Sequence, residues 1–232
     1  MLWNLEISTI MDGNFICKYP GKKVNMGFLK KYFNNTCKPD GFLGRMMITG
    51  MNSGHAKMAA WGTSKFTSMN PDSIIDLGCG GGKNVQELMK KYPNAKMTAV
   101  DYSEVSVECS KKRNKEEIKK GRCKVVQGDV SKLNLKDNTY DLATAFETVY
   151  FWPGPVKSFK EVFRILKPDG IFVIVNESDG TNDKDQKWVD IIDGMSMYTE
   201  QQMISFLKEA GFKDIKVFHN HKKYWISFQA RK

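Results

Sequence analysis

The sequence predicts a doubly wound α/β fold, and three observations support this prediction. A short apolar strand around Ile74, Ile75 and Leu77 runs into a glycine-rich turn, and a segment with helical spacing follows from Lys83. Apolar runs of strand length then alternate with helical segments, the order that builds a parallel sheet. The chain has 232 residues, of which 41% are hydrophobic. This length suits one large α/β domain with additions.

Residues 1–70 precede this alternation and are predicted to form an N-terminal extension. A turn signal at Asp12-Gly13 indicates a weakly ordered or short hairpin lead-in over residues 1–22. The apolar spacing of residues 24–33 predicts a helix. We therefore expect an N-terminal extension and helical cover, followed by a ligand-binding core over residues 71–232.

A methionine-rich segment occupies residues 42–66. Met47, Met51, His55 and Met58 fall close to one helical stripe. Such a stripe more often packs a helix onto the main domain. The functional alternative is a mobile helical cover over a bound ligand, with His55 and Trp61 near the substrate.

The elements after the glycine-rich turn alternate in type. We expect helices over residues 83–92, 104–120, 156–166 and 199–210, and strands over residues 97–100, 123–128, 142–146 and 171–175. Leu166-Lys-Pro-Asp-Gly170 indicates a turn before the last of these strands. Two final segments, residues 212–218 and 223–230, alternate in β fashion and predict a terminal antiparallel hairpin.

Glycine spacing narrows the class of ligand. A dinucleotide fingerprint needs glycines at n, n+2 and n+5, but the third position counted from Gly78 is Lys83. A phosphate-binding loop needs Ser or Thr after the lysine, and Asn84 stands there. The chain instead has an acid and then glycines at n, n+2 and n+4, in Asp76-Leu-Gly-Cys-Gly-Gly-Gly82. A carboxylate suits a ligand ammonium and makes poor sense beside a pyrophosphate, which is itself anionic. The missing n+5 glycine argues against a dehydrogenase.

A second acid ends the next predicted strand. Asp101 lies 23 residues after Gly78. This separation is close to the offset of about 20 residues at which an acid binds ribose hydroxyls in nucleotide-binding folds, and a carboxylate can accept from both hydroxyls. The alternative role is a helix N-cap, for which Ser103 is the better candidate. We expect Ser103 to cap the helix and Asp101 to stay free for the ligand.

Composition and charge favour a cytoplasmic, globular protein. No apolar run approaches the about 18 residues that cross a bilayer, and no secretion signal is expected. The five cysteines are scattered and form no metal-ligand spacing, so reduced thiols and no metal site are expected. The net charge of +10 invites a nucleic-acid interpretation. Lysine far outnumbers arginine and spreads over predicted helix faces, which disfavours that partner.

Together these features resemble the class I S-adenosylmethionine-dependent methyltransferases over roughly residues 70–232. The resemblance rests on Asp76–Gly82, Asp101, Gly128-Asp129, Tyr140-Asp-Leu142 and Leu166–Gly170. The last motif is typical of the small-molecule branch that includes ubiquinone and menaquinone C-methyltransferases. The resemblance implies a seven-stranded, mostly parallel sheet with an antiparallel last strand, and S-adenosylmethionine as cofactor.

The resemblance also implies a set of cofactor contacts, namely Asp76, Gly78, Cys79, Gly80, Asp101, Tyr102, Asp129, Val130 and Glu147. Asp129 falls where the family places an acid that contacts the adenine amino group, although a helix or turn cap explains it equally well from chemistry alone. Cys79 is expected to be structural rather than a nucleophile. Amino-methylating enzymes of the nucleic-acid type carry an Asn/Asp-Pro-Pro-Tyr/Phe motif after the fourth strand. This chain has Phe146-Glu-Thr-Val-Tyr150 there, which disfavours methylation of an adenine or glutamine nitrogen.

The predicted function is methyl transfer to an O, N or C atom of a small molecule. If the acceptor needs a general base, His55, Glu147 and Tyr150 are the candidates. Two alternatives stay open. One is a module that binds the cofactor without turnover, and the other is an RNA methyltransferase that uses the lysine-rich surface. The acceptor atom and the oligomeric state are left undetermined.

Overall fold

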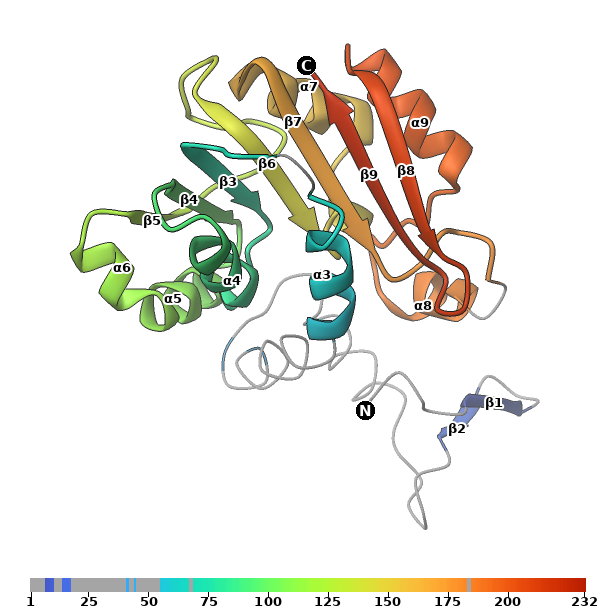
Figure 1. Ribbon diagram of the computed structural model, residues 1–232. Helices are drawn as coiled ribbons and strands as arrows, with labels where there is room; N and C mark the ends of the chain where they lie inside the picture. The colour runs from blue at the N-terminus through green and yellow to red at the C-terminus, as the bar shows by residue number, and fades with distance from the viewer. Residues whose placement is uncertain are drawn as a thin grey trace.

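A seven-stranded sheet dominates the computed structural model, which describes residues 7–10, 14–17, 41, 44, 55–66, 69–182 and 185–232 (Figure 1). Its strand order is β5-β4-β3-β6-β7-β9-β8. The strands span Ser73–Leu77 (β3), Lys96–Asp101 (β4), Cys123–Gln127 (β5), Tyr140–Phe146 (β6), Leu166–Asn176 (β7), Lys213–Asn220 (β8) and Trp225–Arg231 (β9). The predicted doubly wound α/β fold is confirmed.

Strand direction also follows the prediction. Strands β3 to β7 are parallel, and β9 pairs antiparallel with both β7 and β8. The predicted antiparallel last strand is thus β9, which lies inside the sheet while β8 forms the edge. Strand order reverses between β3 and β6, and the crevice at such a point is where open α/β sheets bind ligands.

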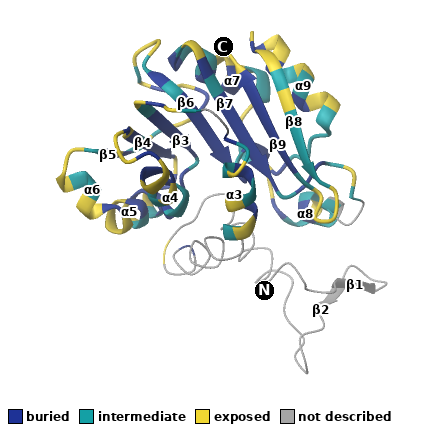
Figure 2. Ribbon diagram, in the orientation of Figure 1, coloured by how far each residue is buried: buried dark blue, intermediate teal, exposed yellow. Residues whose placement is uncertain are grey.

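Helices cover both faces of the sheet. They span Ala56–Thr63 (α3), Lys83–Lys91 (α4), Glu104–Arg113 (α5), Lys115–Lys119 (α6), Pro155–Ile165 (α7), Gln186–Ile191 (α8) and Glu200–Glu209 (α9). Side chains of α3, α4 and α5 share a core cluster with one face of the sheet, and side chains of α7 and α9 share another with the opposite face. Figure 2 shows buried residues concentrated in the strands between these layers.

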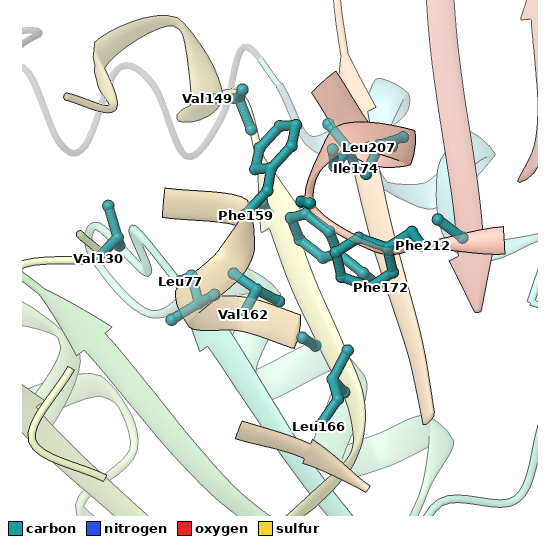
Figure 3. Close-up of a cluster of buried hydrophobic side chains, with 14 of the residues drawn as sticks. Leu77, Val130, Val149, Phe159, Val162, Leu166, Phe172, Ile174, Leu207 and Phe212 are labelled. Atoms are coloured by element: carbon teal, nitrogen blue, oxygen red, sulfur yellow. The ribbon is translucent and has the colours of Figure 1, made fainter. Parts of the chain in front are cut away.

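The two core clusters explain why successive residues of a strand can both be apolar. Neighbouring Ile74 and Ile75 are both fully buried, and they join opposite clusters because successive strand residues face opposite sides. In the cluster under α7 and α9, aromatic rings of Phe159, Phe172 and Phe212 pack together (Figure 3). The ring centroids of Phe159 and Phe172 are 5.5 Å apart in an edge-to-face arrangement.

Two element predictions are wrong in detail. The helix predicted over residues 104–120 is broken at Asn114, whose backbone leaves the helical region and whose buried side chain donates hydrogen bonds to the carbonyls of Gly82 and Ser110. The turn predicted at Leu166–Gly170 belongs to β7. Leu166 pairs with Tyr140, and a register shift separates this pair from the rest of the ladder.

The N-terminal prediction is tested only in part. Residues Ile7–Ile10 (β1) and Asn14–Cys17 (β2) form an antiparallel pair, as the predicted hairpin requires. The helix predicted over residues 24–33 lies outside the described residues, as do residues 42, 43 and 45–54 of the methionine-rich segment. The division at residue 70 stays a prediction. In the described part of the chain, helices long and apolar enough for a membrane span are absent.

Candidate functional site

The carboxyl ends of four parallel strands meet at a cavity of about 380 Å³. Each strand contributes a short run to its wall: Gly78–Gly81 after β3, Asp101 and Tyr102 at β4, Gly128–Val130 after β5, and Phe146–Thr148 at β6. His55, which precedes α3, and the segment Phe151–Pro153 complete the wall on the β6 side. The cavity therefore lies where a doubly wound sheet is expected to bind its ligand.

Glycine is required at two positions of the loop for different reasons. A Cβ atom at Gly78 would lie 2.1 Å from Thr148 Oγ1, so this position is closed by protein. At Gly80 the same atom would meet open space, and Gly80 lines the cavity. Both residues have φ in the left-handed region that favours glycine. The open space above Gly80 therefore allows a ligand to approach the backbone closely.

Helix α5 and the residue after it hold the loop in this orientation. Arg113 Nε donates to the carbonyl of Gly81 at 2.8 Å, and Asn114 Nδ2 donates to that of Gly82 at 3.1 Å. These two hydrogen bonds hold the loop by its carbonyl groups, on the side that packs on α5. A loop anchored from behind presents a fixed surface to the ligand.

Asp101 lies at the end of β4 and is 6% exposed. Its Oδ2 accepts from Gly80 N at 2.8 Å and its Oδ1 from Ser103 N at 2.9 Å. Ser103 caps α5 by accepting from Ser106 N, which confirms that prediction. Contrary to the expectation from the sequence, Asp101 is not free of protein partners. Each carboxylate oxygen still has acceptor capacity for a ligand hydroxyl, while burial raises the pKa of Asp101.

Asp76 is placed behind the cavity wall. Its side chain is buried within the sheet, outside the lining of the cavity, and Thr144 Oγ1 donates to Asp76 Oδ1 at 2.6 Å. Burial raises its pKa to about 7. Its predicted direct contact with the cofactor stays a prediction, and its hydrogen bond with Thr144 connects β3 to β6.

The other predicted cofactor contacts line the cavity. Tyr102 is exposed, Val130 is buried, and Asp129 accepts from Ser131 N at 2.8 Å as a turn cap would. The Cys79 thiol is buried and its pKa is raised well above the ordinary value by that burial. A thiol of raised pKa is a poor nucleophile, which agrees with the structural role expected for Cys79.

The predicted base candidates converge with a residue that the sequence analysis missed. Tyr150 Oη donates to Glu147 Oε1 at 3.2 Å, and the backbone N–H of Glu177 donates to the same oxygen. His55 Nε2 lies 3.7 Å from Glu177 Oε2. His55 and Glu147 line the cavity, whereas Tyr150 is buried behind it. Glu177 directly follows β7, so the rule that places ligands at carboxyl ends of strands could have identified it.

Burial shifts the pKa values of Glu147, Glu177 and His55 towards their neutral forms. It raises the pKa of Glu147 well above the usual range, with the nearby Glu177 carboxylate adding to the effect. Burial, and then the charge of Asp185, raises the pKa of Glu177 to about 7. Burial lowers the pKa of His55 to about 4. The imidazole is therefore neutral at pH 7, and its contact with Glu177 is not an ion pair there.

Trp61 is the one candidate substrate neighbour that the structure places elsewhere. Its ring packs at a centroid distance of 5.9 Å from that of Trp225 on β9, and it does not line the cavity. Gly62, next to it, would place a Cβ atom 2.5 Å from Val175 Cγ1, so α3 lies directly on β7. Packing onto the main domain, the structural alternative for this segment, therefore holds for Trp61, while His55 reaches the cavity.

Comparisons with known proteins agree with this geometry. Residues 75–174 match the family model of a methyltransferase domain. The uncharacterized methyltransferase YdaC of Bacillus subtilis is 26% identical over 176 residues, which cover 74% of this chain and 89% of YdaC. Cycloartenol-C-24-methyltransferase 1 of Oryza sativa subsp. japonica is 28% identical over 151 residues, 61% of this chain and 44% of that protein.

The fold is also similar to solved structures. A SAM-dependent methyltransferase from Thermotoga maritima superposes with a TM-score of 0.67 at 18% identity, covering 88% of this chain and 99% of that one. YdaC apart, this chain spans less than two thirds of the length of the first curated relatives, such as 40% of a chloroplastic hydroquinone methyltransferase and 54% of a malonyl-[acyl-carrier protein] O-methyltransferase.

The residues present fit S-adenosylmethionine. The open space over Gly80 admits a ligand against the backbone, and Asp101 offers a buried carboxylate suited to ribose hydroxyls. Asp129 and Val130 line the cavity beyond β5, where the family resemblance places the adenine. The match of residues 75–174 to a methyltransferase domain and the similarity of the fold to that of a solved SAM-dependent methyltransferase both agree with the class I S-adenosylmethionine-dependent methyltransferases that the motifs predict.

Proposed function

We propose that this protein transfers the methyl group of S-adenosylmethionine to an O, N or C atom of a small molecule. One observation carries the proposal: a single cavity joins the glycine loop and Asp101 to Glu147 and His55. When bound, S-adenosylmethionine supplies an electrophilic methyl group on a sulfonium sulfur and remains as S-adenosylhomocysteine once that group has moved. The protein holds the cofactor, excludes water and orients the acceptor.

Among the three base candidates, Glu147 is best placed to act on the acceptor. It lines the cavity, and burial raises the pKa of its carboxyl group well above the usual range, which makes its carboxylate a stronger base than an exposed glutamate. Tyr150 acts through Glu147, since its hydroxyl donates to Glu147 Oε1, and is therefore a positioning residue. His55, with a pKa of about 4, is a weak base that can orient the acceptor by hydrogen bonding.

The lining on the β6 side supports an acceptor with an apolar body and one polar group. Phe146, Phe151 and Trp152 contribute aromatic surface next to the Glu147 carboxylate. Among the described residues that line the cavity, Lys83 is the only lysine or arginine, and its Nζ pairs with Glu87 at 2.7 Å. A phosphate-rich acceptor such as RNA needs several such cations, so a small molecule is favoured.

The test is an assay of the full chain with S-adenosylmethionine. The panel holds small apolar compounds bearing hydroxyl or amino groups, with a separate arm of total RNA, and S-adenosylhomocysteine is measured. We expect turnover on small molecules, reduced at least tenfold in Glu147→Gln. Glu200→Gln, which changes a carboxylate on α9 across the sheet, is the control.

Two outcomes would contradict the proposal. Cofactor binding without turnover in any arm would favour the silent binding module. Methylation confined to RNA, with binding that weakens steeply as salt rises, would favour the RNA methyltransferase.

A further inference from the structure

We propose that His55, Glu147 and Glu177 bind one divalent transition-metal cation on the β6 side of the cavity. The three residues come from separate segments, before α3, after β6 and after β7. Their ligand atoms all lie within 4.8 Å of one another. One imidazole nitrogen with carboxylate oxygens is a donor set suited to ions such as Mn²⁺, Fe²⁺ and Zn²⁺. Sequence spacing does not indicate this site, because its members are 30 to 122 residues apart along the chain.

The distances between the ligand atoms of these residues are close to those found around a coordinated ion. Ligand atoms bound at about 2.1 Å lie about 3 to 4 Å from one another around the metal. His55 Nε2 and Glu177 Oε2 are already 3.7 Å apart. Small rotations of the three side chains would therefore bring their ligand atoms to coordination distance of one ion, without movement of the sheet.

Hydrogen bonds behind the group hold one ligand in place. The Ser178 N–H donates to Tyr150 Oη, and Tyr150 in turn donates to Glu147 Oε1. The backbone N–H of Glu177 donates to the same carboxylate oxygen. Metal ligands in proteins are commonly oriented by such outer hydrogen bonds. The side chains of His55 and Glu177 keep 12% and 25% exposure, which gives an ion a route of entry.

The balance of charge favours a cation at this place. Glu147 and Glu177 lie side by side, and Asp185 adds negative charge close to both. The positive charge of the amino terminus acts on Glu177 in the opposite direction, as the smallest of the three effects on its pKa. In the described part of the chain, neither glutamate forms a salt bridge with a lysine or arginine. Buried carboxylates need a cation or a proton as compensation, and a divalent ion compensates two of them at once.

This inference rests on the proposed function and refines the part played by Glu147. A bound cation would coordinate a hydroxyl group of the acceptor and lower its pKa, so that this hydroxyl loses its proton to solvent on coordination. Glu147 then acts as a ligand of the ion. The aromatic side chains Phe151 and Trp152 would hold the apolar body of the acceptor beside it.

Titration of the metal-free full chain with MnCl₂ tests the site. Free Mn²⁺ is followed by its electron paramagnetic resonance signal, and cofactor affinity is measured in the same samples by calorimetry. We expect one Mn²⁺ per chain, with affinity at least tenfold weaker in Glu177→Gln and in His55→Ala. Glu200→Gln serves as the matched control, because Glu200 Oε2 lies 3.1 Å from His219 Nε2 in a second histidine–glutamate pair.

Each result bears on the site. Absence of Mn²⁺ binding, or equal binding in the wild type and Glu177→Gln, would overturn it. Binding lost in Glu200→Gln alone would place the ion at β8 and also overturn it. If Mn²⁺ fails to bind while S-adenosylmethionine binds, the metal site fails and the proposed function stands. Failure of cofactor binding would instead count against the proposed function.

Discussion

Asp76 is a buried carboxyl group whose pKa is raised to about 7 from 3.8 by burial. Between these two values the folded chain binds more protons than the unfolded chain. The stability that this group contributes is therefore fully present below pH 4 and is lost as pH rises through 7. A change from 3.8 to about 7 corresponds to a loss of about 4 kcal/mol at most.

Asp76→Asn removes this titration while keeping a side chain of the same size. We expect the free energy of unfolding of the variant to fall less between pH 4 and pH 7 than that of the wild type, measured by urea titration across that range. Glu147 and Glu177 titrate in both proteins, so the difference isolates Asp76. Parallel pH profiles for the two proteins would show that Asp76 is not perturbed.

Gly80 differs from Gly78 in what surrounds it, and this difference predicts different defects. Gly80→Ala should weaken S-adenosylmethionine binding at least tenfold, because the new methyl group enters the open space above the loop. Gly78→Ala should lower the stability of the fold instead, by about 1–3 kcal/mol or more, because of the clash with Thr148.

The control for both variants is Gly121→Ala. Gly121 has a φ of 72°, with open space around it, and lies outside the cavity lining. Gly121→Ala therefore measures only the loss of stability from placing an alanine in the left-handed backbone region. Thermal unfolding and calorimetric titration of the three variants separate the effects. Equal cofactor affinity in Gly80→Ala and Gly121→Ala would exclude Gly80 from the binding surface.

At the scale of elements, the break between α5 and α6 supports the glycine loop. Asn114 is 3% exposed, and its Nδ2 bonds the carbonyl of Gly82 at 3.1 Å. Asn114→Ala should cost about 1–3 kcal/mol of stability, because the Gly82 carbonyl loses a donor in a buried place. It should also weaken cofactor binding, although Asn114 does not line the cavity. Denaturant unfolding and calorimetry give the two quantities, and a variant with unchanged values for both would contradict this role.

The same break illustrates what sequence periodicity can and cannot predict. Apolar runs identify the strands, since a buried parallel strand must be apolar on both faces. The capping box of α9, formed by Thr199 and Gln202, was likewise predictable from local chemistry. The end of α5 depends on a hydrogen bond from Asn114 to a loop 32 residues away. Local propensity carries no information about such a contact.

At the scale of the whole molecule, the half of the cavity in which we propose that the cofactor binds was largely predictable. Asp101, Tyr102 and Asp129 lie at the carboxyl ends of successive parallel strands, and topology brings such ends together. The acceptor half was less predictable. Glu177 follows β7, whose end carries no motif, and His55 reaches the cavity only through the packing of α3 on β7. Such tertiary contacts are not encoded in spacing.

The most direct test of the central claim is calorimetric titration of the purified full chain with S-adenosylmethionine, with NAD as the comparison ligand. We predict binding of S-adenosylmethionine alone, weakened at least tenfold in Asp101→Ala and unchanged in Asp214→Asn, a change on β8 outside the cavity lining. Circular dichroism checks that each sample is folded. A folded wild type that binds neither ligand, or a cofactor affinity unaffected by Asp101→Ala, would contradict the claim that this cavity is a methyltransferase site.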